Sequence, residues 1–254
     1  MEKISSYILT KNSEKYLKSI LDKLDKFSDE IIVVDSGSLD NTEIIAKSYA
    51  KVKFLFKEFL NFKDQRIFAE RVCSYDIIYF NDSDEIPSDE MVISIGDLKN
   101  EGFPLDAYRI SREWYVLGKK IHSIYPIVSP DNPIRVYNKR KVSFYDSTMV
   151  HETLTGYKCV GKIQGVLMHL TFETKAELWH KLDFYTTIAS QDLIKKKKNI
   201  TFFNLILNPI SAFVKWFILK NGYRDGYTGL ILARYAFLYT LLKYKKVKLL
   251  KQVS

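Results

Sequence analysis

The stretch Ile77-Ile78-Tyr79-Phe80-Asn81-Asp82-Ser83-Asp84 decides the fold class of this chain. Its first four residues form an apolar run typical of a buried β-strand, and the run stops just before two carboxylates. Open α/β sheets bind their ligands at the carboxyl ends of such strands. Hard divalent cations prefer oxygen ligands and usually keep waters and substrate phosphates. Asp82 and Asp84 therefore suggest a metal ion that holds a diphosphate at the strand end, with a solvated acidic turn as the alternative.

Three strand-and-helix units precede this stretch. The predicted strands are Ile4 to Thr10, Glu30 to Val34, Val52 to Phe56 and Ile77 to Phe80. The predicted helices start at Asn12-Ser13, at Asp40-Asn41 and at Lys63, and the last two end near Ala50 and at Cys73. Fully apolar strands that alternate with amphipathic helices indicate a parallel sheet with helices on both faces. We therefore predict an α/β fold with a Rossmann-like, mostly parallel sheet.

Polar residues follow three of the predicted strands: Thr10-Lys11-Asn12, Asp35-Ser36 and Asp82-Ser83-Asp84. We expect these groups to converge at one edge of the sheet. Asp35 can accept a hydrogen bond from a base or ribose, and Lys11, Lys63 or Arg66 can neutralise phosphate. A turn with a helix cap is the alternative for Ser36, and solvated helix faces are the alternative for Lys63 and Arg66. A nicotinamide or flavin dinucleotide site is disfavoured, because no G-x-G-x-x-G motif follows the first strand.

The positive charge of the chain is concentrated near its C-terminus. The formal net charge is +9, and residues 195–254 hold 13 Lys and Arg but one acid, Asp225. Basic charge beside aromatic residues, as in the segment that begins at Phe202, suggests helices lying in an anionic membrane interface. A second apolar helix is predicted from about Thr228 to Tyr244. The alternative is a helical pair that packs on the rest of the chain or on a second copy.

Other features of the composition indicate a cytosolic protein. Cys73 and Cys159 are too few for a disulfide scaffold and suit a reducing compartment. The N-terminal residues lack the apolar core of a signal peptide. The most apolar stretch, Phe202 to Leu219, is interrupted by polar residues and by Pro209, so a membrane-spanning helix is not expected. The motif Thr174-x-x-Glu177 predicts a capping box that opens a helix.

In their order and spacing, these stretches resemble the nucleotide-diphospho-sugar glycosyltransferases of family 2, which have the GT-A fold. The matching stretches are Ile8 to Asn12, Glu30 to Thr42, Phe62 to Arg66 and Tyr79 to Glu85. Later segments resemble the subgroup that adds sugars to bacterial lipopolysaccharide core: Arg135-Val136-Tyr137, Val150-His151-Glu152, Met168-His169 and Gly222 to Gly229. One departure is Ile67, which stands where many members have Asn.

The resemblance implies an inverting transfer from a nucleoside-diphosphate sugar, with UDP-hexose favoured, to a bacterial glycan or glycolipid. It implies nucleotide-sugar binding by Thr10, Lys11, Asn12, Glu14, Asp35, Ser36, Lys63, Arg66, Asp82 and Ser83. It implies Mn²⁺ or Mg²⁺ as cofactor, held by Asp84 with Asp82 nearby, and His169 as a further ligand. A core or hinge histidine is the alternative for His169. Glu152 is the implied general base.

We expect residues 1–100 to form the nucleotide-sugar half, 101–173 the acceptor-binding and catalytic half, and 174–254 a helical basic and aromatic tail. The expected location is the cytoplasm, on the inner face of the membrane, which residues 195–254 contact. No nucleic-acid partner is expected, and a homo-oligomer is open. An Asp-x-Asp phosphatase, a sugar nucleotidyltransferase and a non-enzymatic basic membrane-binding protein are the alternatives. The phosphatase motif would begin the fold, and the nucleotidyltransferase would carry a glycine-rich loop after the first strand.

Overall fold

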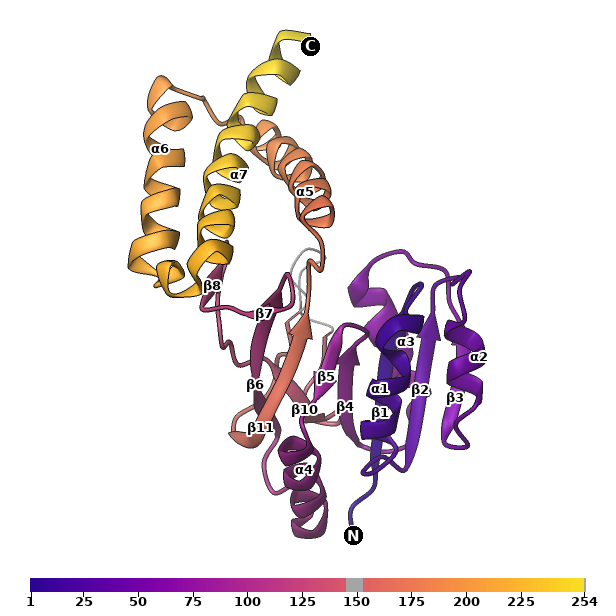
Figure 1. Ribbon diagram of the computed structural model, residues 1–254. Coiled ribbons are helices and arrows are strands. Elements are labelled where there is room, and N and C mark those ends of the chain that lie inside the picture. The colour runs from indigo at the N-terminus through magenta and orange to yellow at the C-terminus, as the bar shows by residue number, and fades with distance from the viewer. Residues whose placement is uncertain (145–152, 254) are drawn as a thin grey trace. The chain divides into compact units, whose positions relative to one another are not determined.

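A computed structural model describes residues 1–144 and 153–253 of the chain (Figure 1). The chain divides into two compact units. The first contains residues Met1–Arg112 and Asn132–His169, and the second contains Glu113–Asp131 and Leu170–Ser254. The predicted division at residues 100 and 173 is not tested by this result and stays a prediction.

The sheet carries most of the first unit. Its strands are β1 (Ile4–Thr10), β2 (Glu30–Asp35), β3 (Val52–Phe56), β4 (Ile77–Asp82), β5 (Glu85–Pro87), β6 (Ala107–Val116), β10 (Ile134–Asn138) and β11 (Val160–Leu170). They are arranged in the order β3-β2-β1-β4-β10-β6-β11-β5. The first four run parallel, as predicted. Beyond β4 the pairings of β10 with β4 and β6, and of β11 with β5, are antiparallel.

Helices cover both faces of the parallel strands, which confirms the α/β prediction. The helices of this unit are α1 (Glu14–Leu24), α2 (Thr42–Lys47), α3 (Phe62–Val72) and α4 (Asp89–Glu101). Successive side chains of a strand point to opposite faces. Ile77 and Tyr79 of β4 therefore pack in the core that includes α1, whereas Ile78 and Phe80 pack in the core that includes Ala69 of α3.

Several predicted boundaries differ from the structure. Strand β4 continues to Asp82 instead of ending at Phe80, because β4 stays paired with β1 through Asp82. Helix α2 ends at Lys47, three residues before the predicted end at Ala50. Ser13 occupies the N-cap of α1 without a side-chain capping bond, since its hydroxyl accepts from the N–H of Lys11 instead.

The second unit is built from α5 (Lys175–Lys195), α6 (Phe202–Val214) and α7 (Gly226–Val253), with the short strands β7 (Lys119–Lys120), β8 (Ser123–Ile124) and β9 (Ile127–Val128). The predicted capping box at the start of α5 is confirmed, with Thr174 and Glu177 as its two residues. Leu178 and Leu182 of α5 pack against Leu232 and Tyr235 of α7 in a third core. Helix α7 extends beyond the predicted Thr228 to Tyr244 at both ends.

The apolar side chains of α6 are largely exposed. Phe202 is 70% exposed and Phe203 63%. Within the described part of the chain, the helical stretch Phe202–Leu219 is long and apolar enough to cross a membrane by length and composition alone, and 11% of it is buried. The helical stretch continues through Pro209, and the interrupting polar residues do not end it. The expectation that this stretch does not span a membrane stays a prediction.

Candidate functional site

Two pockets adjoin the carboxyl end of β4. The first, which we call the strand-end pocket, has a volume of about 540 Å³. It is lined by Leu9, Thr10, Lys11, Ser36, Phe59, Phe62, Gln65 and Ser83. Residues that follow β1, β2 and β4 thus meet at one place, as the sequence predicts, because parallel strands end at the same edge of the sheet.

Asp35 organises the turn after β2. The side chain is buried, and its Oδ1 accepts a hydrogen bond from Thr10 Oγ1 at 2.9 Å. Its Oδ2 accepts from the backbone N–H groups of Gly37 and Ser38 at 2.8 and 2.7 Å. Lys11 Nζ donates to the carbonyl oxygens of Ser36 and Gly37. These hydrogen bonds stabilise a turn after β2, as the alternative interpretation of this segment predicts. Contact of Asp35 with a base or ribose stays a prediction.

Asn12 and Glu14 tie the segment after β1 to the loop after β2. Asn12 Oδ1 accepts from the N–H of Leu39 at 2.8 Å. Glu14 Oε2 accepts from the backbone N–H and the side-chain amide of Asn41 at 3.0 and 2.8 Å. Lys63 is half-buried in the first turn of α3. Binding of nucleotide-sugar by these three residues stays a prediction.

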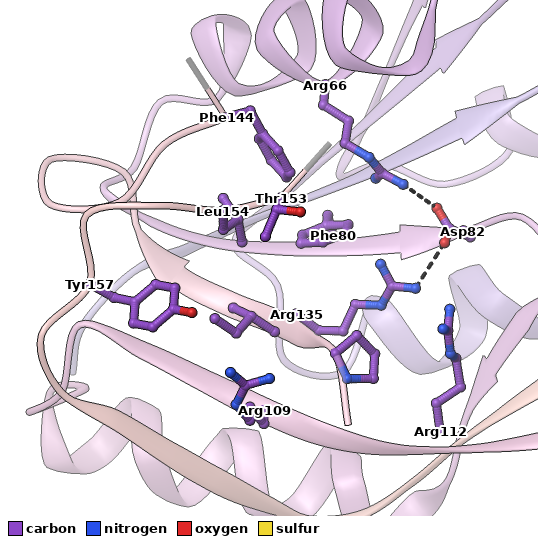
Figure 2. Close-up of a pocket in the computed structure, with 12 residues that line it drawn as sticks. Arg66, Phe80, Asp82, Arg109, Arg112, Arg135, Phe144, Thr153, Leu154 and Tyr157 are labelled. Carbon is purple, nitrogen blue, oxygen red and sulfur yellow. Dashed lines mark hydrogen bonds and ion pairs between the residues drawn. The ribbon is translucent and has the colours of Figure 1, made fainter. Parts of the chain in front are cut away.

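The second pocket, the arginine pocket, has a volume of about 370 Å³. It is lined by Arg66, Phe80, Asp82, Arg109, Arg112, Pro133, Ile134, Arg135, Phe144, Thr153, Leu154 and Tyr157 (Figure 2). Asp82 lies between two arginines, with its Oδ1 2.9 Å from Arg66 Nη2 and its Oδ2 2.8 Å from Arg135 Nη2. Burial disfavours the charged carboxylate, but Arg135 and Arg66 outweigh it and hold the pKa of Asp82 well below its usual range.

Glu85 extends this ion-pair network. Its side chain is fully buried, and Oε1 lies 2.8 Å from Arg112 Nη1 and also contacts Arg135 Nη2. Burial opposes ionisation of Glu85, and Arg135 more than compensates, so the pKa of Glu85 falls to about 2. Five side chains therefore form a chain of ion pairs in which positive and negative charges alternate, in the order Arg66, Asp82, Arg135, Glu85 and Arg112.

Asp84 and His169 are brought together by strand pairing. In the ladder between β11 and β5, His169 lies opposite Glu85, the residue after Asp84. His169 Nδ1 is 3.4 Å from Asp84 Oδ1 and 3.6 Å from Glu85 Oε1. Burial raises the pKa of Asp84, against the lowering effect of His169.

The donor atoms of Asp84 and His169 fit a shared divalent cation. Two ligands of one such ion, each about 2.1 Å from it, lie about 3.0–3.4 Å apart at octahedral to tetrahedral angles. Asp82 is different, since both of its oxygens contact arginines. Within residues 1–144 and 153–253, no group of three or more His, Cys, Asp or Glu side chains forms a metal cluster. The pair therefore fits a site completed by phosphate and water rather than an all-protein cage.

Glu152, the predicted general base, lies outside the described residues, as does His151. The flanking residues are described. Phe144 and Thr153 both line the arginine pocket, and Ser143 and Thr155 form a β-bridge. The described residues on either side of residues 145–152 therefore both line this pocket.

Sequence reasoning missed Glu85 and Arg112 as site residues and assigned no role to Arg135. Glu85 was visible only as the end of a matched acidic stretch. Arg135 lies 53 residues after Asp82 along the chain, so no local pattern links the two. Strand pairing between β10 and β4 brings them into contact.

The sequence matches known proteins along most of its length. Residues 5–120 match the sequence model of the protein family Glycosyl transferase family 2. An uncharacterized glycosyltransferase of Rickettsia typhi is 31% identical over 243 residues, which cover 91% of this chain and 82% of the relative. The lipopolysaccharide core biosynthesis glycosyltransferase LpsC of Rhizobium meliloti is 25% identical over 254 residues, covering 96% of this chain and 91% of LpsC.

Solved structures show a looser likeness. S. aureus TarS 1–349 aligns with a TM-score of 0.49 and 17% identity, covering 99% of this chain and 92% of that chain. Glucosyl-3-phosphoglycerate synthase from Mycobacterium tuberculosis, solved with Mn²⁺, UDP and glucosyl-3-phosphoglycerate, aligns with a TM-score of 0.43 and 19% identity over 66% of this chain and 72% of that chain.

Proposed function

Because this chain belongs to glycosyltransferase family 2, we propose that it is a metal-dependent, inverting enzyme that transfers a hexose from a UDP-sugar to a bacterial cell-surface glycan. The lipopolysaccharide or lipooligosaccharide core is the proposed acceptor, which the similarity to LpsC supports. The observation that carries the proposal is the strand-end pocket, where Thr10, Lys11 and Ser36 meet Ser83, the residue before Asp84.

The two halves of the donor are assigned to different groups. The nucleoside is assigned to the strand-end pocket, where Phe59 and Phe62 offer aromatic surface and Lys11 a positive charge. Asp84 and His169 are the proposed ligands of Mn²⁺ or Mg²⁺, which supplies electrostatic stabilisation of the departing diphosphate when bound. We assign Asp82 a positioning role, because ion pairs with Arg66 and Arg135 hold its carboxylate in place.

The proposed reaction is a single displacement. An acceptor hydroxyl attacks the anomeric carbon on the face opposite the diphosphate, and the bond from that carbon to the diphosphate oxygen breaks. The hydroxyl proton passes to a carboxylate, which we assign to Glu152. Thr153, the next residue in the chain, lines the arginine pocket, so we assign the acceptor to that side of the site.

Sugar-nucleotide binding is expected to depend on Mn²⁺ and on Asp84. Titration of the full chain with a panel of sugar nucleotides, with and without Mn²⁺, measures both. In Asp84→Asn we expect Mn²⁺ affinity to fall by at least about 10–100-fold, since one of two protein ligands is weakened. Asp89→Asn is the matched control, because the Asp89 side chain is 70% exposed on α4. Mn²⁺-independent binding of every sugar nucleotide would overturn the metal role.

The second unit is proposed to lie on the inner face of the cytoplasmic membrane. The exposed apolar side chains of α6 begin at Phe202, shortly after the basic run Lys195 to Lys198 in the chain. Apolar side chains next to basic residues bind anionic bilayers by burial and by charge together. A lipid-linked acceptor would be met at such a surface.

Substitution of both Phe202 and Phe203 by Ser is expected to weaken binding to phosphatidylglycerol vesicles by roughly tenfold or more, because each buried aromatic contributes about 1.5–3 kcal/mol. Co-sedimentation measures the partitioning. The matched control replaces Phe184 and Tyr185, which are 57% and 43% exposed on α5, by Ser. Equal losses in the two double variants, or equal binding to phosphatidylcholine vesicles, would refute the membrane assignment.

A further inference from the structure

We propose that Asn81 is a positioning residue, whose side-chain amide holds the turn that carries Asp84 and so sets the place of the Asp84 carboxylate beside His169. This inference rests on the metal site of the proposed function and adds a residue that is not itself a proposed ligand. Asn81 lies in β4, directly before Asp82, and its side chain is completely buried.

The turn that carries Asp84 connects β4 to β5, and each end of it belongs to a different strand pairing. At the first end, Asp82 is paired with Leu9 of β1 in a parallel ladder. At the second end, Glu85 is paired with His169 of β11 in an antiparallel ladder. The ladders hold the ends of the turn and not the residues between them. The position of the Asp84 carboxylate therefore depends on what holds the turn itself.

The side chain of Asn81 joins the two ends of this turn. Its Nδ2 donates to the carbonyl oxygen of Asp82 at 2.7 Å and to the carbonyl oxygen of Glu85 at 2.7 Å. These two hydrogen bonds use both N–H donors of the amide. One buried side chain thus connects the last residue of β4 to the first residue of β5, and we call this arrangement the amide bridge.

Tyr79 fixes the orientation of the Asn81 amide. Its hydroxyl donates to Asn81 Oδ1. Tyr79 lies two residues earlier in the same strand, so the two side chains point to the same face of the sheet. The Tyr79 ring is buried and packs edge-on against Phe27. The opposite amide orientation would place Oδ1 against two carbonyl oxygens, so the hydrogen bonds allow one orientation.

The amide bridge affects the geometry of the proposed metal site. Asp84 Oδ1 lies 3.4 Å from His169 Nδ1, a spacing that one divalent cation can span. The β11 ladder holds the backbone of His169, and the amide bridge holds the turn of Asp84, so a change in the turn changes this spacing. Groups that orient metal ligands typically change metal affinity by about 10–100-fold when they are replaced.

Asn81→Leu tests the amide bridge, because leucine is similar in size and has no amide. We expect Mn²⁺ affinity of the full chain, measured by electron paramagnetic resonance, to fall by about 10–100-fold. Without metal, we expect amide hydrogen exchange of residues 82–86 to become at least about tenfold faster, because the turn opens more often. The control is Ser6→Ala, which removes a buried hydrogen bond between the hydroxyls of Ser6 and Ser28.

Two outcomes would overturn the proposal. Unchanged exchange of residues 82–86 in Asn81→Leu would show that the amide does not hold the turn. Unchanged Mn²⁺ affinity, or an equal loss in Ser6→Ala, would show that Asn81 serves only the stability of the fold. If the unmodified chain binds no Mn²⁺, the metal role in the proposed function fails, and hydrogen exchange alone decides whether the amide bridge exists.

Tyr79→Phe is a milder variant, which keeps the ring in the core and removes only the hydroxyl that orients the amide. We expect smaller changes in the same direction, about fivefold in exchange and in Mn²⁺ affinity, the size of one hydrogen bond. The control is Tyr137→Phe, which loses the hydrogen bond from the Tyr137 hydroxyl to Glu70. Equal effects of the two substitutions on the turn would contradict the proposal, also where Asn81→Leu does not fold.

Discussion

Replacing Glu152 by Gln is expected to slow glycosyl transfer about 10²–10⁴-fold and to leave sugar-nucleotide binding unchanged. A positioned carboxylate removes the proton of the attacking hydroxyl in the transition state, and an amide of the same shape cannot. A rate loss of this size is usual when a general base is removed. Thr153, the residue that follows Glu152 in the chain, lines the arginine pocket. The donor is assigned to other residues, so its affinity is not expected to depend on residue 152.

The measurement compares kcat with the dissociation constant of the donor. The acidic limb of the pH–rate profile, which reports ionisation of the base, is expected to disappear in Glu152→Gln. Glu90→Gln is the control, because Glu90 is an exposed glutamate in the first turn of α4. If Glu152→Gln retains the kcat of the unmodified enzyme, the base is another group.

Replacing Arg135 by Met is expected to lower the free energy of unfolding by about 3–5 kcal/mol, the usual cost of breaking a buried ion pair by removing one partner. Arg135 contacts both Asp82 and Glu85. Without it, Glu85 still has Arg112 and the nearby His169, and Asp82 still has Arg66, so buried negative charge is left undercompensated. Urea denaturation measures the loss. In Arg140→Met, where the lost pair is exposed, we expect about 0–1 kcal/mol.

Acid should reduce the difference between Arg135→Met and the unmodified chain. The pKa of Glu85 is about 2 in the folded protein, below its ordinary value of 4.5. A carboxyl whose pKa is lowered by folding contributes stability above its unfolded pKa and loses it as the pH falls through the folded value. That contribution is therefore lost between about pH 4.5 and pH 2, and the variant has less of it to lose. Equal stability of Arg135→Met and Arg140→Met would show that the network does not act as described.

Much of the nucleotide-binding part of the fold could be predicted, because local sequence patterns encode it. The apolar runs of β1, β2 and β4 are separated by helices, which requires parallel strands, and parallel strands end at one edge. The meeting of Thr10, Ser36 and Ser83 follows from that geometry alone. The exposure of the apolar side chains of α6 could not be predicted in this way. The residues of a helix do not reveal whether other parts of the protein pack on it.

By itself, the sequence determined the α/β class, the parallel strands and the edge at which their polar residues gather, because each depends on periodicity and chain order. Only the tertiary structure showed that the two aspartates of the Asp82-Ser83-Asp84 stretch have different partners. Asp82 contacts Arg66 and Arg135, whereas Asp84 lies beside His169. Those partners come from strands β10 and β11 and from helix α3, and the register of antiparallel pairing between segments 50 or more residues apart has no local signature.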